Sequence, residues 1–127
     1  AGLPYSCVIS YAIYADTDRP HPRMYGAFGR VIREYVRERG ILSMEEALWK
    51  MTGMPAGRMR LTDRGLLREG YYADVNIFSP DGFRDQATYS SPMGLATGLK
   101  ACLVNGIVAV WEDALTGEAP GRLLKVI

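Results

Sequence analysis

The apolar positions divide the chain into a helical half followed by a half of short strands. Apolar and aromatic residues fill Ser6–Tyr14 with little charge between them, which predicts a largely buried strand. Over residues 28–36 they recur on one helical face, which predicts an amphipathic helix that ends at Gly40. A second helix is predicted from Ser43, because Ser43 and Glu46 have the spacing of a capping box.

The apolar face of this second helix is rich in methionine. Its members are Met44, Ala47, Leu48 and Met51. A methionine stripe can form an adaptable binding groove, but at helical spacing it more often belongs to the core. We therefore predict a core position for it, and we expect the helix to end at Gly53 and Pro55.

From about Leu61 the pattern changes to short β-rich runs separated by turn residues. Strands are predicted at Leu66–Leu67, at Ala73–Phe78, on both sides of Asn105–Gly106 and in the final residues 121–127, with turns at Gly70 and Asp81–Gly82. The Asn-Gly pair is the clearest local signal, because it suits the positive φ angles of a two-residue hairpin turn. Residues 84–98 are expected to form a long surface connection.

The composition mainly excludes certain classes of protein and partner. The chain has 127 residues, 48% of them hydrophobic and 23% charged, with a formal net charge of +1, which is typical of one globular domain rather than a disordered chain. Glutamates interleave with the arginines of residues 30–39, so we expect a salt-bridged helix face and no nucleic-acid partner. No apolar run is long enough to cross a membrane and no signal peptide is recognisable, so no membrane partner and a cytoplasmic location are expected.

Both cysteines lie in apolar runs without a second potential ligand nearby. We predict that Cys7 and Cys102 are reduced and buried; a disulfide or a metal site is the less favoured alternative.

Candidate chemistry gathers in residues 15–26, "ADTDRPHPRMYG", between the first predicted strand and the first predicted helix. Asp16 or Asp18 could ligate a metal or transfer a proton, or could only cap a turn or the following helix. His21 is expected to be a structural hydrogen-bonding residue rather than a ligand. Arg23 could bind a substrate carboxylate through two hydrogen bonds, or pair with a nearby aspartate.

Several longer motifs resemble the N-acyl-D-amino-acid deacylases (D-aminoacylases) of the amidohydrolase superfamily. They are "HPR-x-x-G-x-F", "S-x-E-x-A-x-x-K-M-T-G", "D-R-G-x-x-x-x-G-x-x-A-D", "V-N-G" and "T-G-x-x-x-G-R", in the order of that family, from about Arg19 to Lys125. The resemblance implies an α/β fold. Residues 1–59 would comprise the last strand and helix of a (β/α)₈ amidohydrolase barrel with a linking helix. Residues 60–127 would form a small β-sandwich-like domain.

The resemblance also implies zinc-dependent hydrolysis of an N-acyl-D-amino acid to a D-amino acid and a carboxylate. In the family an aspartate of a "Ser-Asp-Gly" at the end of the eighth strand transfers the proton. Counted without a gap from "HPR", Ala12 occupies that position, whereas a short deletion brings Asp16 there. We take Asp16 as the candidate catalytic residue and Arg23 as the candidate substrate-binding residue.

A complete barrel takes about 250 residues, and the family's zinc ligands lie in upstream strands outside this sequence. Zinc is therefore expected in the complete enzyme, and this chain alone is expected to hold no metal and to be inactive. Unpaired strand edges at Ser6–Tyr14 predict an upstream barrel polypeptide or a homo-oligomer as partner. The alternative is a non-catalytic, stand-alone α/β binding or assembly module derived from the same family.

Overall fold

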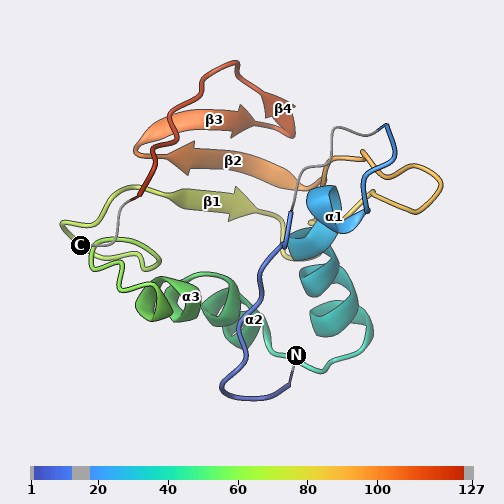
Figure 1. Ribbon diagram of the computed structural model, residues 1–127, viewed down its shortest axis with the longest axis horizontal. Helices are drawn as coiled ribbons and strands as arrows, with labels where there is room; N and C mark the ends of the chain where they lie inside the picture. Colours follow the sequence, from blue (N-terminus) through green and yellow to red (C-terminus); the bar gives the residue numbers. More distant parts are fainter. Residues whose placement is uncertain (1, 13–17, 125–127) are drawn as a thin grey trace.

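The chain forms a group of helices beside a four-stranded sheet (Figure 1). The computed structural model describes residues 2–12 and 18–124. The helical elements are α1 (Arg23–Arg30), the π-helical η1 (Val31–Glu38), α2 (Met44–Met51) and α3 (Gly53–Arg58). The strands are β1 (Val75–Phe78), β2 (Leu99–Val104), β3 (Ile107–Trp111) and β4 (Ala114–Leu115).

The predicted helix starts and stops are confirmed at two places. α1 runs directly into η1, and the chain leaves the helix at Gly40, whose φ of 56° is in the left-handed region that favours glycine. At the start of α2, the Glu46 N–H donates to Ser43 Oγ (3.1 Å) and the Ser43 N–H donates to Glu46 Oε2 (2.9 Å). Both halves of the predicted capping box are therefore formed.

The main core lies between η1 and α2. Its buried members are Val31, Ile32, Leu42 and Ala47, and the partly buried Met44, Leu48 and Met51 pack against them. The methionine stripe thus belongs to the core, as predicted. This core is small, because it is built from one helix pair and involves no strand of the sheet.

The sheet is antiparallel throughout, with the strand order β1-β2-β3-β4. Its β2–β3 hairpin turns at Asn105 (φ 50°) and Gly106 (φ 82°), and Val104 pairs with Ile107 across the turn. The predicted Asn-Gly hairpin is therefore confirmed, with both central residues at the positive φ of a type I′ turn.

Three of the sequence motifs meet at this hairpin. The Asn105 N–H donates to Asp74 Oδ1 (2.8 Å), and Arg64 forms an ion pair with the other oxygen of Asp74. Arg64 also donates to Asn105 Oδ1 (2.6 Å), and the Gly106 N–H donates to the Ala73 carbonyl (3.0 Å). The "D-R-G", "A-D" and "N-G" motifs therefore have a structural role, since they tie the chain before β1 to the β2–β3 turn.

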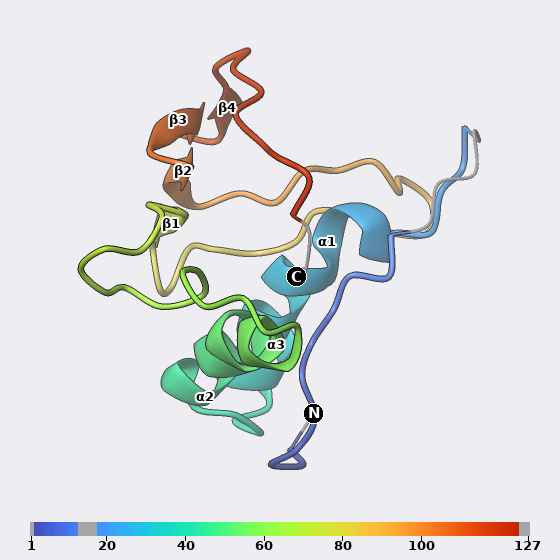
Figure 2. The ribbon, with the colours of Figure 1, turned by 60° about the vertical axis from the view of Figure 1, so that its left-hand side comes forward.

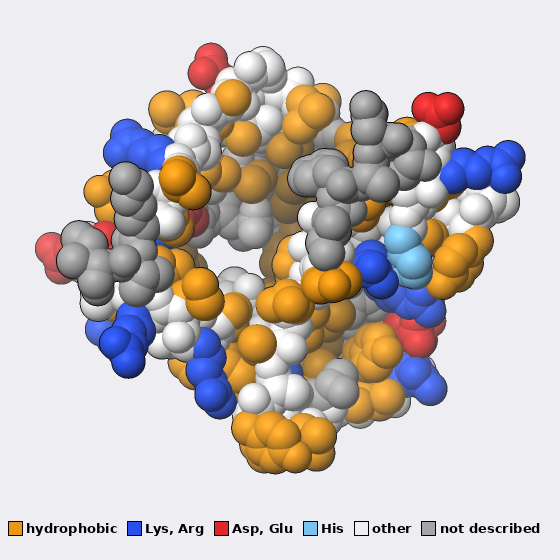
Figure 3. Space-filling model, in the orientation of Figure 1, with side chains coloured by type: hydrophobic (Ala, Val, Ile, Leu, Met, Phe, Trp, Pro, Cys, Tyr) orange, Lys and Arg blue, Asp and Glu red, His pale blue; other side chains and the backbone are white. Residues whose placement is uncertain are grey.

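The helices contact the chain after β1 through α1 and η1. Arg33 donates to both carboxylate oxygens of Asp85 (2.7 and 3.3 Å) and to Glu38, and Arg37 donates to the Pro80 and Phe83 carbonyls (2.7 and 2.8 Å). Beyond this contact the two layers separate (Figure 2), and an opening is visible between them in the space-filling view (Figure 3). Polar contacts at one end, together with the packing of Phe83 against the helical core, thus join the helices to the chain after β1.

The first predicted strand is wrong within the described residues. The exposure of residues 6–12 alternates, but they belong to no strand, and Tyr11 has a φ of 47°, outside the extended region. A strand needs a neighbour along its hydrogen-bonding edge, and no described strand pairs with this segment. The last two residues of the predicted strand, 13 and 14, lie outside the described residues.

Other boundaries also differ from the predictions. Leu66–Leu67 forms no strand, because the preceding Gly65 (φ 84°) turns the chain tightly against α3. Gly53 and Pro55 do not end the helical region; they lie in α3, which follows α2 after a single residue. Residues 121–124 form no strand, whereas the sheet gains the unpredicted two-residue β4.

Both cysteines are free, in agreement with the predicted reduced state. The predicted burial is wrong for Cys7, which is exposed because the segment around it has no covering layer. Cys102 in β2 is partly buried, and burial together with the nearby Asp74 carboxylate raises the pKa of its thiol above the ordinary value.

The Arg33–Asp85 pair is expected to stabilise the joint between the helices and the sheet. Its carboxylate side chain is only 9% exposed, so we expect Arg33→Met or Asp85→Asn to lower the free energy of unfolding by about 2–3 kcal/mol each. The double variant should lose less than the sum of the two. Urea unfolding followed by circular dichroism measures all three. The Arg30–Glu34 pair is the control: the Arg30 side chain is 57% exposed, so Arg30→Met should cost only about 0.5 kcal/mol.

Candidate functional site

The "HPR" turn leads directly into α1. Pro22 is the N-cap residue, and no side chain at that position caps the helix. Instead, the Arg23 N–H donates to His21 Nδ1 (3.1 Å), which satisfies one of the free N–H groups of the first turn. The imidazole therefore has the structural hydrogen-bonding role predicted for it.

His21 also contacts the long connection between β1 and β2. The Tyr89 hydroxyl lies 3.3 Å from His21 Nε2, and the two rings meet edge to face with centroids 5.4 Å apart. Because Nδ1 accepts a hydrogen bond from the backbone, a neutral ring carries its hydrogen on Nε2 and donates to Tyr89. The connection predicted from residues 84–98 thus reaches back to the "HPR" turn.

Arg23 lies at the start of α1 with its side chain exposed. Its guanidinium carbon is 5.0 Å from the centroid of the Tyr11 ring, a cation–π contact that leaves the hydrogen-bond donors of the guanidinium free to point outward. Within residues 2–12 and 18–124, Arg23 forms no ion pair with a carboxylate. Of the two predicted roles, pairing with an aspartate is therefore not observed in this part of the chain.

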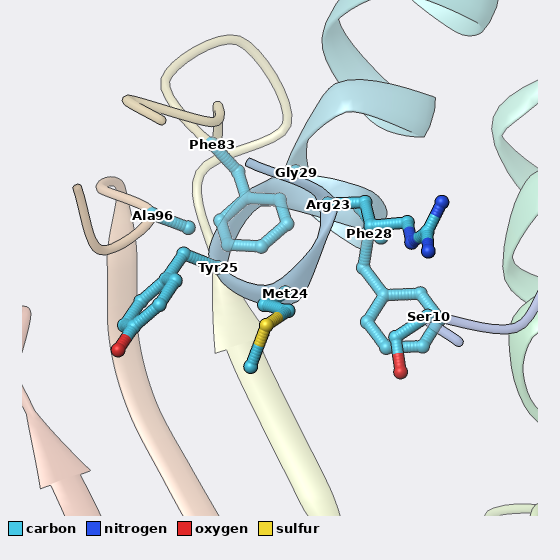
Figure 4. A pocket seen from close by; sticks show the side chains of 9 residues that line it. Ser10, Arg23, Met24, Tyr25, Phe28, Gly29, Phe83 and Ala96 are labelled. Atoms are coloured by element: carbon cyan, nitrogen blue, oxygen red, sulfur yellow. The ribbon is translucent and has the colours of Figure 1, made fainter. Parts of the chain in front are cut away.

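A pocket of about 220 Å³ opens beside Arg23 (Figure 4). Its lining residues are Ser10, Arg23, Met24, Tyr25, Ala27, Phe28, Gly29, Phe83 and Ala96. Figure 4 shows Phe83, Tyr25 and Ala96 on one side, and Arg23 with Phe28 and Ser10 on the other. The pocket therefore places one cation beside a lining of both polar and apolar atoms, which can take a ligand that carries both an anionic group and an apolar group.

The structure describes some, but not all, of the other candidate residues around the "HPR" turn. Asp16 lies outside the described residues. Asp18 is exposed and does not cap α1, since the Arg23 N–H is bonded to His21 instead. Ala12 is half-buried at the end of the described N-terminal segment, one residue after Tyr11.

The described residues bring together no group of three or more histidine, cysteine, aspartate or glutamate side chains. They therefore do not fit a zinc site by themselves, and no chemical step through a metal is derived from them. A search of the same residues finds no helix that is both long enough and apolar enough to span a membrane.

The sequence did not indicate which residues surround Arg23. Tyr11 and Ser10 come from the N-terminal segment, whereas Phe83, Tyr89 and Ala96 come from a segment about sixty residues later in the chain. Contacts at such sequence separation leave no local pattern. The one local signal was the concentration of charged residues and prolines before α1.

Comparison with known proteins identifies the class. The model of the amidohydrolase family matches residues 15–111, which is most of the chain. The chain therefore belongs to the amidohydrolase family.

Within the family it is similar to enzymes named for D-amino-acid substrates. It is 44% identical to D-aminoacylase and 48% identical to N-acyl-D-aspartate deacylase, both from Alcaligenes xylosoxydans xylosoxydans. These matches cover 84% and 83% of this chain, but only 22% and 21% of the relatives. The resemblance seen in the sequence motifs is thus confirmed, and the chain spans about a fifth of the length of the relatives it matches.

Solved structures of D-aminoacylase and of a related deacylase are also similar to this chain. A crystal structure of D-aminoacylase superposes with a TM-score of 0.77 at 40% identity, covering 80% of this chain and 21% of that one. The N-acyl-D-glutamate deacylase of Bordetella bronchiseptica superposes with a TM-score of 0.70 at 42% identity, covering 72% of this chain and 19% of that one. That deacylase is complexed with zinc and with a phosphonate inhibitor that mimics the tetrahedral intermediate of its reaction.

Proposed function

We propose that this chain is one part of a zinc-dependent amidohydrolase that hydrolyses N-acyl-D-amino acids to a D-amino acid and a carboxylate. The observation that carries this proposal is the 44–48% identity to D-aminoacylase and N-acyl-D-aspartate deacylase over more than four fifths of the chain. Because the chain spans only about a fifth of those relatives, the 127 residues alone are proposed to be inactive.

In this proposal residues 1–59 are the last strand and helix of the barrel with a linking helix, and residues 60–127 are the small β domain. Two observations support the division. The described helices end at Arg58 and the strands begin at Val75. The segment 6–12 has no strand partner among the described residues, as expected for a part of the chain whose neighbours belong to other parts of a barrel.

Arg23 is proposed to bind the substrate carboxylate, and Asp16 to act as the general acid and base. An exposed guanidinium beside a partly apolar pocket supports the first role, because it can donate two parallel hydrogen bonds to a carboxylate while the apolar part of the pocket takes an apolar group. For Asp16 the support is its place between the N-terminal segment and α1, where the strand of a barrel would end. Zinc, which makes bound water a nucleophile at neutral pH, would be held by residues outside the described ones.

The missing polypeptide is proposed to cover the apolar surface of this chain. Nine large apolar side chains of the described residues are between 47% and 68% exposed: Leu3, Tyr5, Ile9, Tyr11, Trp49, Met59, Ile77, Leu95 and Trp111. Orange side chains also line part of the opening in Figure 3. Exposed apolar area on this scale is typical of an interface. An upstream barrel polypeptide explains it best, and a second copy of the chain is the alternative.

Native mass spectrometry with metal analysis, combined with an amidase assay, tests the proposal. We expect a companion polypeptide, bound zinc and release of D-amino acids from N-acetyl-D-aspartate, N-acetyl-D-glutamate or N-acetyl-D-leucine, with the L-enantiomers as controls. An intact 127-residue chain without partner, metal or hydrolysis would overturn the catalytic proposal for this molecule. That result would favour the non-catalytic binding or assembly module and would leave the family membership unchanged.

A further inference from the structure

Lys50, in the last turn of α2, is the one charged side chain that is buried among the described residues, with 5% exposure. Its ammonium group donates to the Leu3 carbonyl (2.6 Å), to the Ser6 carbonyl (2.9 Å) and, at 3.4 Å, to Ser6 Oγ. Within the same part of the chain it forms no ion pair. All these acceptors belong to the N-terminal segment, and residues 2–12 and 18–124 provide no other hydrogen-bond acceptor for this ammonium.

A turn in the N-terminal segment, at residues 3–6, presents its carbonyl groups to the Lys50 ammonium. The Ser6 N–H and the Ser6 hydroxyl both donate to the Leu3 carbonyl (3.2 and 2.8 Å), which closes a turn with its carbonyls toward α2. The Lys50 carbonyl in turn accepts from the Val8 N–H (3.0 Å). A buried ammonium is unfavourable unless its donors are satisfied, so the position of Lys50 depends on the segment and the position of the segment depends on Lys50.

The anchored segment leads straight to the candidate site. Three residues beyond Val8, the Tyr11 ring lies under the Arg23 guanidinium, and Ser10 lines the pocket. Figures 1 and 2 both show the segment running from α2 to α1. From Val8 to Tyr11 the chain spans at most about 10 Å. Only residues 9 and 10 separate Val8, which is bonded to the Lys50 carbonyl, from Tyr11, so a displacement at Lys50 is expected to move the surroundings of Arg23.

We propose that Lys50 is a positioning residue: by holding residues 3–8 on α2, it sets the place of Tyr11 relative to Arg23. The catalytic part of this inference rests on the proposed deacylase function. The anchoring itself is a property of this chain alone.

Amide hydrogen exchange of the 127-residue chain tests the anchoring. We expect Lys50→Met to raise the exchange rate of the Val8 amide by about ten-fold or more, with the Ala47 amide of α2 little changed. Lys100→Met is the matched control, because Lys100 is 54% exposed and contacts Glu112 and the Trp111 ring at the surface. Unchanged protection of Val8 would overturn the proposal.

A labelling experiment on the wild-type chain covers the case in which Lys50→Met does not fold. Lys50 should react with an amine-specific ester about ten-fold or more slowly than Lys100, since its ammonium is enclosed by carbonyls. Equal labelling of the two lysines would contradict the enclosure of the Lys50 ammonium by the carbonyls of the N-terminal segment.

Kinetics of the complete zinc-loaded enzyme test the positioning. Lys50→Met should lower kcat and raise KM, each by about ten-fold, while Lys50→Arg should restore most of both. A lower amount of active enzyme with an unchanged KM would overturn the positioning role. If no deacylase activity exists but Val8 exchange still rises, the proposed function fails and the anchoring stands.

Discussion

Replacement of Gly29 by alanine is expected to lower the free energy of unfolding by about 3 kcal/mol. Gly29 is buried in α1, where the helix approaches the chain after β1. A Cβ atom at this position would lie 2.7 Å from the Asp85 nitrogen and 2.9 Å from the Arg84 carbonyl carbon. These are backbone atoms, which cannot rotate away, so the helix and the segment must separate. The separation would also stretch the hydrogen bonds between Arg33 and Asp85.

Gly57 supplies the matched control for this prediction. It also lies in a helix, α3, but a Cβ atom there would meet nothing within 4 Å. Gly57→Ala should therefore stabilise the protein slightly, by about 0.5–1 kcal/mol, because alanine loses less backbone entropy on folding. Thermal unfolding followed by circular dichroism compares the two variants. Similar midpoints for both would contradict the close approach at Gly29.

Features that depend on a few adjacent residues could be predicted from the sequence. The capping box of Ser43 and Glu46 and the Asn105–Gly106 hairpin both formed as expected. In each case the hydrogen bonds or φ angles that define the feature involve only near neighbours in the chain. The apolar face of residues 28–36 was predicted for a similar reason, since its period is a property of a single helix.

Features that depend on distant partners could not be predicted. Composition favours a strand at residues 6–12, but a strand requires a neighbour, and only the Val8 N–H of this segment meets an α2 carbonyl. The hydrogen bonds of the Lys50 ammonium likewise join α2 to residues more than forty positions earlier in the chain. The sequence shows a lysine in a helix, and nothing local marks it as buried.

The candidate site combines both kinds of feature. His21 and Arg23 could be selected from their local motif, and the hydrogen bond between them lies within the "HPR" turn. The aromatic ring under Arg23 and the Phe83 wall of the pocket come from separate segments, so only the structure reveals that the cation lies beside a pocket. This arrangement makes a specific kinetic prediction possible for Arg23.

In the complete zinc-loaded enzyme, Arg23→Met is expected to lower kcat/KM for N-acyl-D-amino acids by about 100-fold, mostly through KM. The guanidinium is proposed to pair with the substrate carboxylate, which is present equally in the ground state and in the transition state. Arg23→Lys should recover only part of the loss, because a lysine cannot donate two parallel hydrogen bonds to one carboxylate. Steady-state kinetics with the three N-acetyl-D-amino acids measure both effects.

Two controls separate carboxylate binding from a structural role of Arg23. Arg39→Met also removes an arginine from an aromatic ring, that of Tyr35, but it lies at the far end of the same helical region and should leave KM unchanged. The second control is a substrate whose carboxylate is replaced by a carboxamide. Wild-type enzyme and Arg23→Met should hydrolyse it at similar rates, since the contact that distinguishes them is gone. An equal 100-fold loss with this substrate would show that Arg23 acts by holding Tyr11 in place, not by binding the carboxylate.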